Sequence, residues 1–132
     1  MSEFNYKVKV FYEDTDAGGV VYYANYLKFF ERARTEAIAE IGLSNNKLLK
    51  DFGILIIVKS CNIDYKKPAK LEDHLEIKSI ITSISNTSFK MMQKAFRDKE
   101  LLTSCEIHLV IVEKSGKPTR IPDELRKKIQ DN

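Results

Sequence analysis

The sequence has few of the residues that characterise disulfide-stapled or metal-binding proteins. Its 132 residues include only two cysteines and two histidines. Cys61 and Cys105 each lie inside a strand-like run with no second cysteine nearby, so we expect two reduced, buried thiols and no disulfide. His74 and His108 are far from each other and from any cysteine pair, which predicts no metal site.

The sequence also lacks long clusters of charged residues of one sign. The formal net charge is +3, the pI is about 8.8, and the lysines are scattered along the chain. This is too weak for a nucleic-acid-binding surface, although it suits a small ligand that carries phosphate. The chain has no phosphate loop and no dinucleotide fingerprint. Its first residues show no basic region followed by an apolar core, and no apolar run is long enough to span a membrane, so we expect a soluble, cytoplasmic protein.

The residues that are present predict an ordinary globular domain. Hydrophobic residues make up 43% of the chain and charged residues 31%, which argues against disorder. A chain of this length suits a single domain, residues 1–132, with a core of its own.

Periodicity predicts one strand followed by one long helix in the first third of the chain. Residues Tyr6–Tyr12 alternate between apolar and lysine positions, as in a half-buried strand. Apolar residues then recur every three or four positions from Asn25 to Ile41, which predicts an amphipathic helix. Asn25 is placed to cap this helix, and Gly42 is placed to end it in a left-handed conformation.

The rest of the chain reads mostly as strands. Ser44 is expected to cap a short helix over residues 45–51 that ends at Gly53. The predicted strands are 54–65, 74–84, 88–96 and 101–112, and a C-terminal helix opens at Pro122. The continuous apolar run Ile54–Val58 predicts a strand end that is buried on both faces.

This element order predicts an α+β fold in which a curved antiparallel sheet wraps around one long helix. The sheet face that turns away from the helix still carries apolar side chains, which we expect a second copy of the chain to cover in a homo-oligomer. These side chains are Ile80, Ile84, Met92, Phe96, Val110 and Val112.

The segment between the first strand and the long helix carries the candidate chemistry. Asp14 and Asp16 precede the pair Gly18–Gly19, which lets the backbone approach a ligand closely beside the free N–H groups of a helix start. Both aspartates could instead serve only as turn and capping residues. Glu31, two turns into the helix, is a further candidate for orienting water or substrate, and its alternative role is a plain surface carboxylate.

A family resemblance is carried by the stretch Tyr12–Tyr22 and by Ala24-Asn25-Tyr26 and Phe30–Glu36. It continues through Asp64-Tyr65, Pro68-Ala69 and Leu71-Glu72-Asp73. Together these residues resemble the YbgC-type acyl-CoA thioesterases, which belong to the 4-hydroxybenzoyl-CoA thioesterase branch of the hotdog-fold superfamily. The resemblance covers nearly the whole chain and implies a hotdog fold.

The resemblance also implies an activity and a site. It implies hydrolysis of acyl-CoA with neither metal nor cofactor, since coenzyme A is part of the substrate. Asp16 matches the catalytic carboxylate, and the backbone N–H of Tyr23 matches the group that polarises the thioester carbonyl. Many family members carry His where this chain has Tyr23. Asp16 could attack the carbonyl directly or act as a general base on water, and both routes stay open. Active sites at a dimer interface, with dimers pairing into tetramers, are implied too.

We expect the substrate to contact this loop, the helix start and a basic segment. The apolar residues favour an uncharged acyl tail, and the lysines are candidates for the phosphates of CoA. The predicted substrate-binding residues are Gly18, Gly19, Val20, Val21, Tyr22, Asn25, Tyr26, Lys66 and Lys67. The alternative function is a non-enzymatic protein that binds acyl-CoA or acyl carriers, in peripheral contact with lipid-synthesis enzymes at the membrane.

Overall fold

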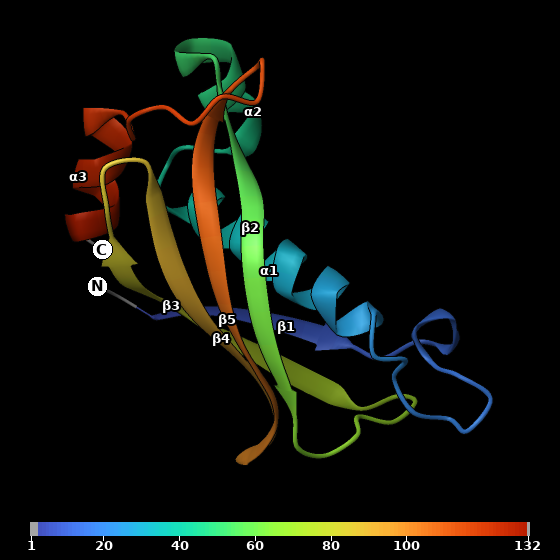
Figure 1. Cartoon of the computed structure of the whole chain (residues 1–132). Coiled ribbons are helices and arrows are strands. Elements are labelled where there is room, and N and C mark those ends of the chain that lie inside the picture. The colour runs from blue at the N-terminus through green and yellow to red at the C-terminus, as the bar shows by residue number, and fades with distance from the viewer. Residues whose placement is uncertain (1–2, 132) are drawn as a thin grey trace.

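The computed structural model describes residues 3–131 and consists of one antiparallel sheet with one long helix against it (Figure 1). The five strands lie in the order β1-β3-β4-β5-β2, and α1 spans Asn25–Glu40. The strand bounds are Glu3–Lys9 (β1), Ile54–Tyr65 (β2), His74–Ile84 (β3), Ser88–Arg97 (β4) and Glu100–Glu113 (β5). The predicted α+β class is therefore confirmed.

The core lies between α1 and the sheet face that it covers. The helix buries its apolar stripe, and every second residue of the central strands faces it. Full burial of a large apolar side chain contributes about 1.5–3 kcal/mol, so this stripe fixes the helix, and its first residues, against the sheet. The buried helix residues are Tyr26, Phe29, Phe30, Ala33, Ala37 and Ile38. Strand residues of the same core are Leu75, Ile77, Phe89, Met91, Ile107 and Leu109.

The smaller helical elements follow the predicted caps. Gly42 has φ +93° and Gly53 has φ +67°, the left-handed conformation expected after each helix. The Ser44 hydroxyl accepts the N–H of Lys47 at 3.2 Å and caps α2 (Asn45–Lys47), which runs into the π-helical turn Leu48–Phe52. A last helix, α3 (Asp123–Asp131), buries Leu125 and Ile129. Within residues 3–131 no helix is long and apolar enough to cross a bilayer.

Two predictions about the first third of the chain are wrong. β1 ends at Lys9 and not at Tyr12, because residues 12–14 form a 3₁₀ turn in which Asp14 Oδ2 accepts the N–H of Phe11 at 2.9 Å. Asn25 is not a helix cap. It is the first residue of α1, and its side-chain amide donates to the carbonyl of Asp14 at 2.9 Å.

The predictions of burial for β2 are also wrong. Leu55, Ile57 and Val58 are 38%, 44% and 49% exposed. The reason is that β2 forms one edge of the sheet, whereas α1 packs along β1 and β3 near the opposite edge. Cys61 of β2 is exposed for the same reason, whereas Cys105 of β5 is buried. Burial, followed by the neighbouring Cys61, raises the pKa of Cys105 to about 11, so this thiol stays protonated at neutral pH.

The outer face of the sheet is covered in part by the chain itself. The segment after β5 folds back so that Pro118 pairs with Val112, and both Val110 and Val112 are buried. Ile80 stays 37% exposed, and Ile84, Met92 and Phe96 are half-buried. The apolar patch predicted for this face is therefore smaller than the sequence suggested.

Candidate active site

The loop that carries Asp16 is a tight turn closed by backbone hydrogen bonds. Thr15 pairs with Val21, the N–H of Asp16 donates to the Val20 carbonyl at 2.9 Å, and the N–H of Gly19 donates to the Asp16 carbonyl at 3.0 Å. Gly19 has φ +78°, a conformation that costs other residues roughly 1–2 kcal/mol. The glycine therefore lets the chain reverse immediately after Asp16.

The two oxygens of the Asp16 carboxylate have different surroundings. Oδ1 accepts the N–H of Gly18 at 2.8 Å, which fixes the orientation of the group. Oδ2 has no hydrogen-bond or ion-pair partner within residues 3–131, and the side chain is exposed. One oxygen thus anchors the carboxylate, and the other is available to a substrate or a water molecule. Asp14, in contrast, is buried and holds the preceding turn.

A second segment, residues 66–73, lies against the Asp16 loop. The N–H of Val21 donates to the Ala69 carbonyl at 2.9 Å, the N–H of Leu71 donates to the Gly19 carbonyl at 3.2 Å, and Val20 pairs with Lys70. The N–H of Ala69 also donates to the buried hydroxyl of Tyr26 at 3.0 Å. The loop is therefore held in place by hydrogen bonds to a segment that is distant in the sequence.

An ion network ties residues 66–73 to the β4–β5 hairpin. Arg97 contacts Asp73 at 2.7 Å and Glu100 at 2.5 Å, and Lys67 contacts Glu100 at 2.7 Å. Burial alone would raise the pKa of Asp73, but hydrogen bonds from the Lys70 N–H and from Arg97 outweigh it, and the pKa lies below its usual value. Hydrogen bonds from Lys67 and Arg97 likewise lower the pKa of Glu100. Both carboxylates are thereby kept ionised.

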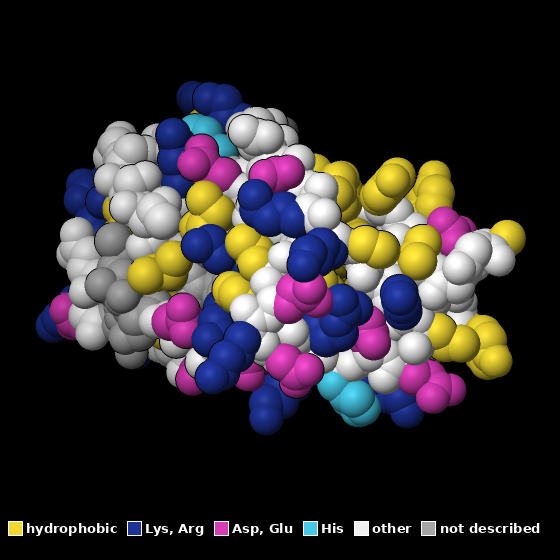
Figure 2. All heavy atoms as spheres, turned by 90° about the horizontal axis from the view of Figure 1, so that it is seen from below, with side chains coloured by type: hydrophobic (Ala, Val, Ile, Leu, Met, Phe, Trp, Pro, Cys, Tyr) yellow, Lys and Arg dark blue, Asp and Glu magenta, His cyan; other side chains and the backbone are white. Residues whose placement is uncertain are grey.

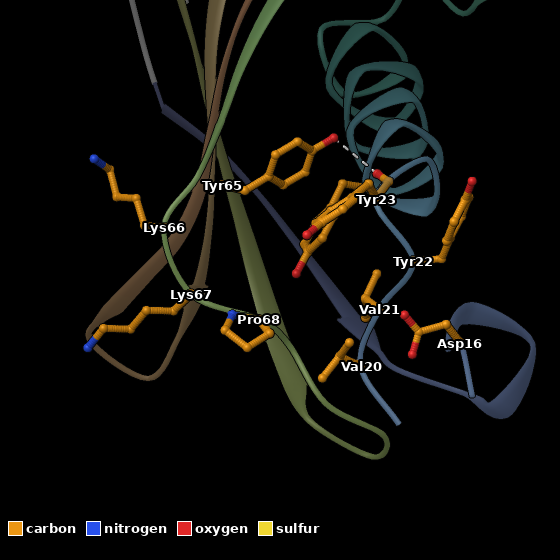
Figure 3. A pocket seen from close by; sticks show the side chains of 10 residues that line it. Asp16, Val20, Val21, Tyr22, Tyr23, Tyr65, Lys66, Lys67 and Pro68 are labelled. Carbon is orange, nitrogen blue, oxygen red and sulfur yellow. Dashed lines mark hydrogen bonds between the residues drawn. The ribbon is translucent and has the colours of Figure 1, made fainter. Parts of the chain in front are cut away.

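Between the two segments and the start of α1 lies a cavity of about 350 Å³ (Figure 3). It brings the predicted catalytic residues Asp16 and Tyr23 to one site, together with most of the predicted substrate-binding residues. The lining residues are Asp16, Val20, Val21, Tyr22, Tyr23, Tyr26, Tyr65, Lys66, Lys67 and Pro68.

Two predicted residues, Glu31 and Asn25, and the glycine pair lie outside this lining. Glu31 lies in a separate groove between α1 and β2, where it accepts the hydroxyl of Thr35 at 3.0 Å. Asn25 is bound to Asp14, and Gly18 and Gly19 shape the turn beneath Asp16. The assignments of Glu31 to catalysis and of Asn25, Gly18 and Gly19 to substrate contact stay predictions.

Sequence reasoning missed Tyr65 and Pro68 as pocket residues. Tyr65 is the last residue of β2, and Pro68 lies in the segment that follows it. Asp64-Tyr65 and Pro68-Ala69 had already entered the family resemblance, so the signal was present. Their contact with the loop depends on how β2 ends beside the helix start, which periodicity does not specify.

Two backbone N–H groups just before α1 have no hydrogen-bond partner in the described part of the chain. The Tyr22 carbonyl accepts the N–H of Asn25 at 2.9 Å, and the Tyr23 carbonyl accepts that of Tyr26 at 3.3 Å. Within residues 3–131, the N–H groups of Tyr23 and Ala24 form no hydrogen bond. Such unpaired N–H groups at a helix start carry partial positive charge and attract an oxyanion.

Three tyrosines form one wall of the pocket. The Tyr65 ring lies 4.8 Å from the ring of Tyr23 and 5.6 Å from that of Tyr26, centroid to centroid. The Tyr65 hydroxyl donates to the backbone carbonyl of Tyr23 at 3.2 Å, the dashed line in Figure 3. Burial, followed by nearby thiols and phenols, raises the pKa of Tyr65, so its hydroxyl keeps its proton at neutral pH.

The surface around the loop is aromatic. Phe11, Tyr12, Tyr22 and Tyr23 are 57%, 79%, 56% and 66% exposed. Seen from below, hydrophobic side chains gather at the end of the molecule where the loop after β1 lies (Figure 2). No group of three or more His, Cys, Asp or Glu that could bind a metal occurs in the described part of the chain.

The fold and the site together define a class. A long helix packed against an antiparallel sheet, with Asp16 and Tyr23 lining one pocket, is the arrangement that the family resemblance implies for a hotdog-fold thioesterase. The family model described as the thioesterase-like superfamily matches residues 10–129. The chain therefore belongs to this superfamily.

Individual relatives agree with this membership. The chain is 36% identical to the acyl-CoA thioesterase YbgC of Haemophilus influenzae over 124 residues, covering 93% of this chain and 91% of the relative. It is 39% identical to the acyl-CoA thioester hydrolase YbgC of Escherichia coli O6:H1, covering 92% of each chain. A probable thioesterase from Bartonella henselae has a similar crystal structure, with a TM-score of 0.88 and 30% identity over 92% of this chain and 100% of the other.

Proposed function

We propose that the protein hydrolyses acyl-CoA thioesters to the free acid and coenzyme A. The observation that carries this proposal is that one pocket is lined both by Asp16, whose carboxylate is anchored, and by Tyr23, whose backbone N–H has no partner in the described part of the chain. A thioester carbonyl is already electrophilic, so hydrolysis needs only a nucleophile and a site for the negative charge that develops on oxygen. The names of the relatives support the same reaction.

In the proposed reaction the carbonyl oxygen accepts the N–H of Tyr23 at the start of α1. Loss of one such donor typically costs about 100-fold to 1,000-fold in rate. Oδ2 of Asp16 can attack the carbonyl carbon and expel the CoA thiolate, leaving a mixed anhydride that water hydrolyses. Alternatively, Oδ2 takes a proton from a water molecule that attacks the same carbon, and the tetrahedral intermediate then expels the CoA thiolate. Both routes use the free oxygen of the anchored carboxylate.

The side chains that line the cavity suit the two chemically different parts of an acyl-CoA. Val20 and Val21 offer an apolar wall to an uncharged acyl tail. Lys66 and Lys67 line the same cavity from the segment after β2 and suit the phosphates of CoA. Lys67 is bound to Glu100, so a phosphate would share this cation with a carboxylate. Glu31 is proposed to reach a site only in an assembly, since its groove is separate from the Asp16 cavity.

We further propose a homodimer formed through the free edge of β2. This strand has 12 residues, pairs only with β5 within residues 3–131, and exposes Leu55, Ile57 and Val58. A long apolar edge of this kind is normally paired or covered in a stable protein. Association of dimers into tetramers would cover Ile80 and the remaining apolar side chains on the outer face.

Hydrolysis of a series of short-chain and long-chain acyl-CoAs by the wild type and Asp16→Asn tests the function. The wild type should release CoA, and the substitution should reduce kcat by at least about 100-fold while the protein stays folded. Wild-type turnover in Asp16→Asn would refute the catalytic assignment. A wild type that binds acyl-CoA without releasing CoA would instead favour the non-enzymatic acyl-CoA-binding or acyl-carrier-binding alternative at a membrane lipid-synthesis complex.

A further inference from the structure

The Tyr65–Tyr23 contact joins the end of β2 to the backbone of the proposed oxyanion site. The Tyr65 hydroxyl donates to the Tyr23 carbonyl at 3.2 Å. That carbonyl belongs to the same peptide unit as the N–H of Ala24. The peptide is planar, and the described chain contains no cis peptide bond, so the two groups point in opposite directions. A partner that holds the carbonyl therefore also sets the direction of the Ala24 N–H.

The neighbouring peptide unit is held in the same manner. Its carbonyl, that of Tyr22, accepts the N–H of Asn25 at 2.9 Å, which directs the N–H of Tyr23 away from the body of the helix. The Tyr23 carbonyl receives only a long helical bond, 3.3 Å from the N–H of Tyr26. The Tyr65 hydroxyl is thus a second anchor at the point where the helix itself holds the peptide weakly.

The ring and the backbone of Tyr65 are both held by neighbouring residues. Its ring is packed against those of Tyr23 and Tyr26, and Tyr26 is fully buried and bound to the Ala69 N–H. Its backbone continues the ladder with β5, where Tyr65 pairs with Thr103. The hydroxyl is therefore placed by the sheet, while the group that it binds belongs to the helix start (Figure 3).

We propose that Tyr65 is a positioning residue that holds the Tyr23–Ala24 peptide so that the N–H groups of Tyr23 and Ala24 act together as the oxyanion site. This proposal rests on the proposed thioesterase function and adds to it a second donor and the residue that orients it. Two convergent donors stabilise a tetrahedral oxyanion better than one, provided that they do not need to reorganise during the reaction.

The substitution Tyr65→Phe removes the hydroxyl and keeps the ring in the pocket wall. We expect kcat to fall about 3-fold to 10-fold, the size of one neutral hydrogen bond, with KM changed less than about 2-fold. Tyr12→Phe is the matched control, because this hydroxyl lies near the same loop, is exposed, and makes no hydrogen bond within residues 3–131. It should leave kcat, KM and the melting temperature unchanged.

Two non-hydrolysable ligands separate positioning from pocket shape. A dethia-CoA ketone, in which a methylene group replaces the thioester sulfur, keeps the carbonyl; an S-alkyl-CoA thioether of equal length lacks it. Tyr65→Phe should weaken binding of the ketone about 3-fold or more by calorimetry and leave the thioether affinity unchanged. Equal effects on both ligands, or no effect on the ketone and on kcat, would overturn the proposal. If the wild type released no CoA from any acyl-CoA, the proposed function would fail, and the ligand pair would still decide the role of Tyr65.

Discussion

Gly18 and Asp16 are joined by a 2.8 Å hydrogen bond from the backbone N–H of Gly18 to Oδ1 of Asp16. Gly18 also leaves little room for a side chain here. A Cβ atom added to Gly18 would lie 3.3 Å from Oδ1 of Asp16, which is closer than most real Cβ contacts. The absence of a side chain at position 18 is therefore part of how the carboxylate is oriented.

Replacing Gly18 with Ala should lower kcat about 10-fold and change the melting temperature little. The methyl group would press on Oδ1 and rotate the carboxylate, while Gly18 is exposed and does not have a positive φ. Gly116→Ala is the control, because its φ of +92° makes a substitution strained at a site outside the pocket. It should lower the melting temperature and keep kcat, and the reverse pattern in the two variants would contradict this role of Gly18.

Tyr23→His should raise turnover if an acid–base side chain at this position limits the rate. The backbone N–H is kept, and a His side chain can add general acid–base catalysis, which typically raises the rate by about 100-fold to 10,000-fold. We expect a rise of about 3-fold to 10-fold and a new inflection near pH 6–7 in the profile of kcat against pH. Tyr12→His places the same group outside the pocket and should reproduce neither change. A Tyr23→His enzyme with the wild-type profile would rule out this explanation.

The network around Arg97 should make the fold sensitive to acid. The folded-state pKa values of Asp73 and Glu100 are lowered, so their stabilising effect is present above the ordinary carboxylate range. It is lost as the pH falls through about 4 and below. Melting temperatures measured from pH 7 to pH 3 should fall less steeply in Arg97→Met, which starts from a lower value at pH 7.

The exposed pair of Arg120 and Asp123 supplies the control for this experiment. Its two side chains are 61% and 87% exposed, and ion pairs in such positions contribute about 0–1 kcal/mol. Arg120→Met should therefore retain the acid dependence of the wild type. Parallel curves for Arg97→Met and the wild type would exclude the network as the source of the effect.

Val58→Lys should separate the proposed dimer into protomers. Val58 is 49% exposed at the free edge of the sheet, so the lysine is tolerated in one protomer but introduces two charges into a paired edge. Light scattering at micromolar concentration should give about 15 kDa for the variant, the mass of one chain, and at least twice that for the wild type. Ile80→Lys alters the outer face of the sheet and should leave dimers. A wild-type mass of one chain would end the dimer proposal.

The sequence predicted those features that depend on local pattern. The bounds of β2 and β3 and the extent of α1 to within one residue followed from periodicity, and the ends at Gly42 and Gly53 followed from glycine geometry. The family resemblance assigned Asp16 and Tyr23 to one site, and the two residues line one pocket on either side of one turn.

The features that failed depend on which strands become neighbours. The apolar run at the start of β2 looked buried, but the strand order places it at an edge. The contact of Tyr65 with Tyr23 and the ion pair of Arg97 with Asp73 join residues that are far apart in the chain. Asn25 is not a cap because it lies inside α1, where its side-chain NH2 donates to a carbonyl of the preceding turn. None of these has a local signature.

The backbone pairing of residues 19–21 with residues 69–71 has a consequence for the order of folding. The turn that presents Asp16 is stabilised by backbone hydrogen bonds with Ala69 and Leu71. Residue 73 leads directly into β3. Closing such a long loop costs entropy that only later contacts offset, so the fragment ending at Tyr65 should not assemble this turn. In pulse-labelling hydrogen exchange during refolding, the amide of Val21 should become protected together with β3 and after the middle of α1.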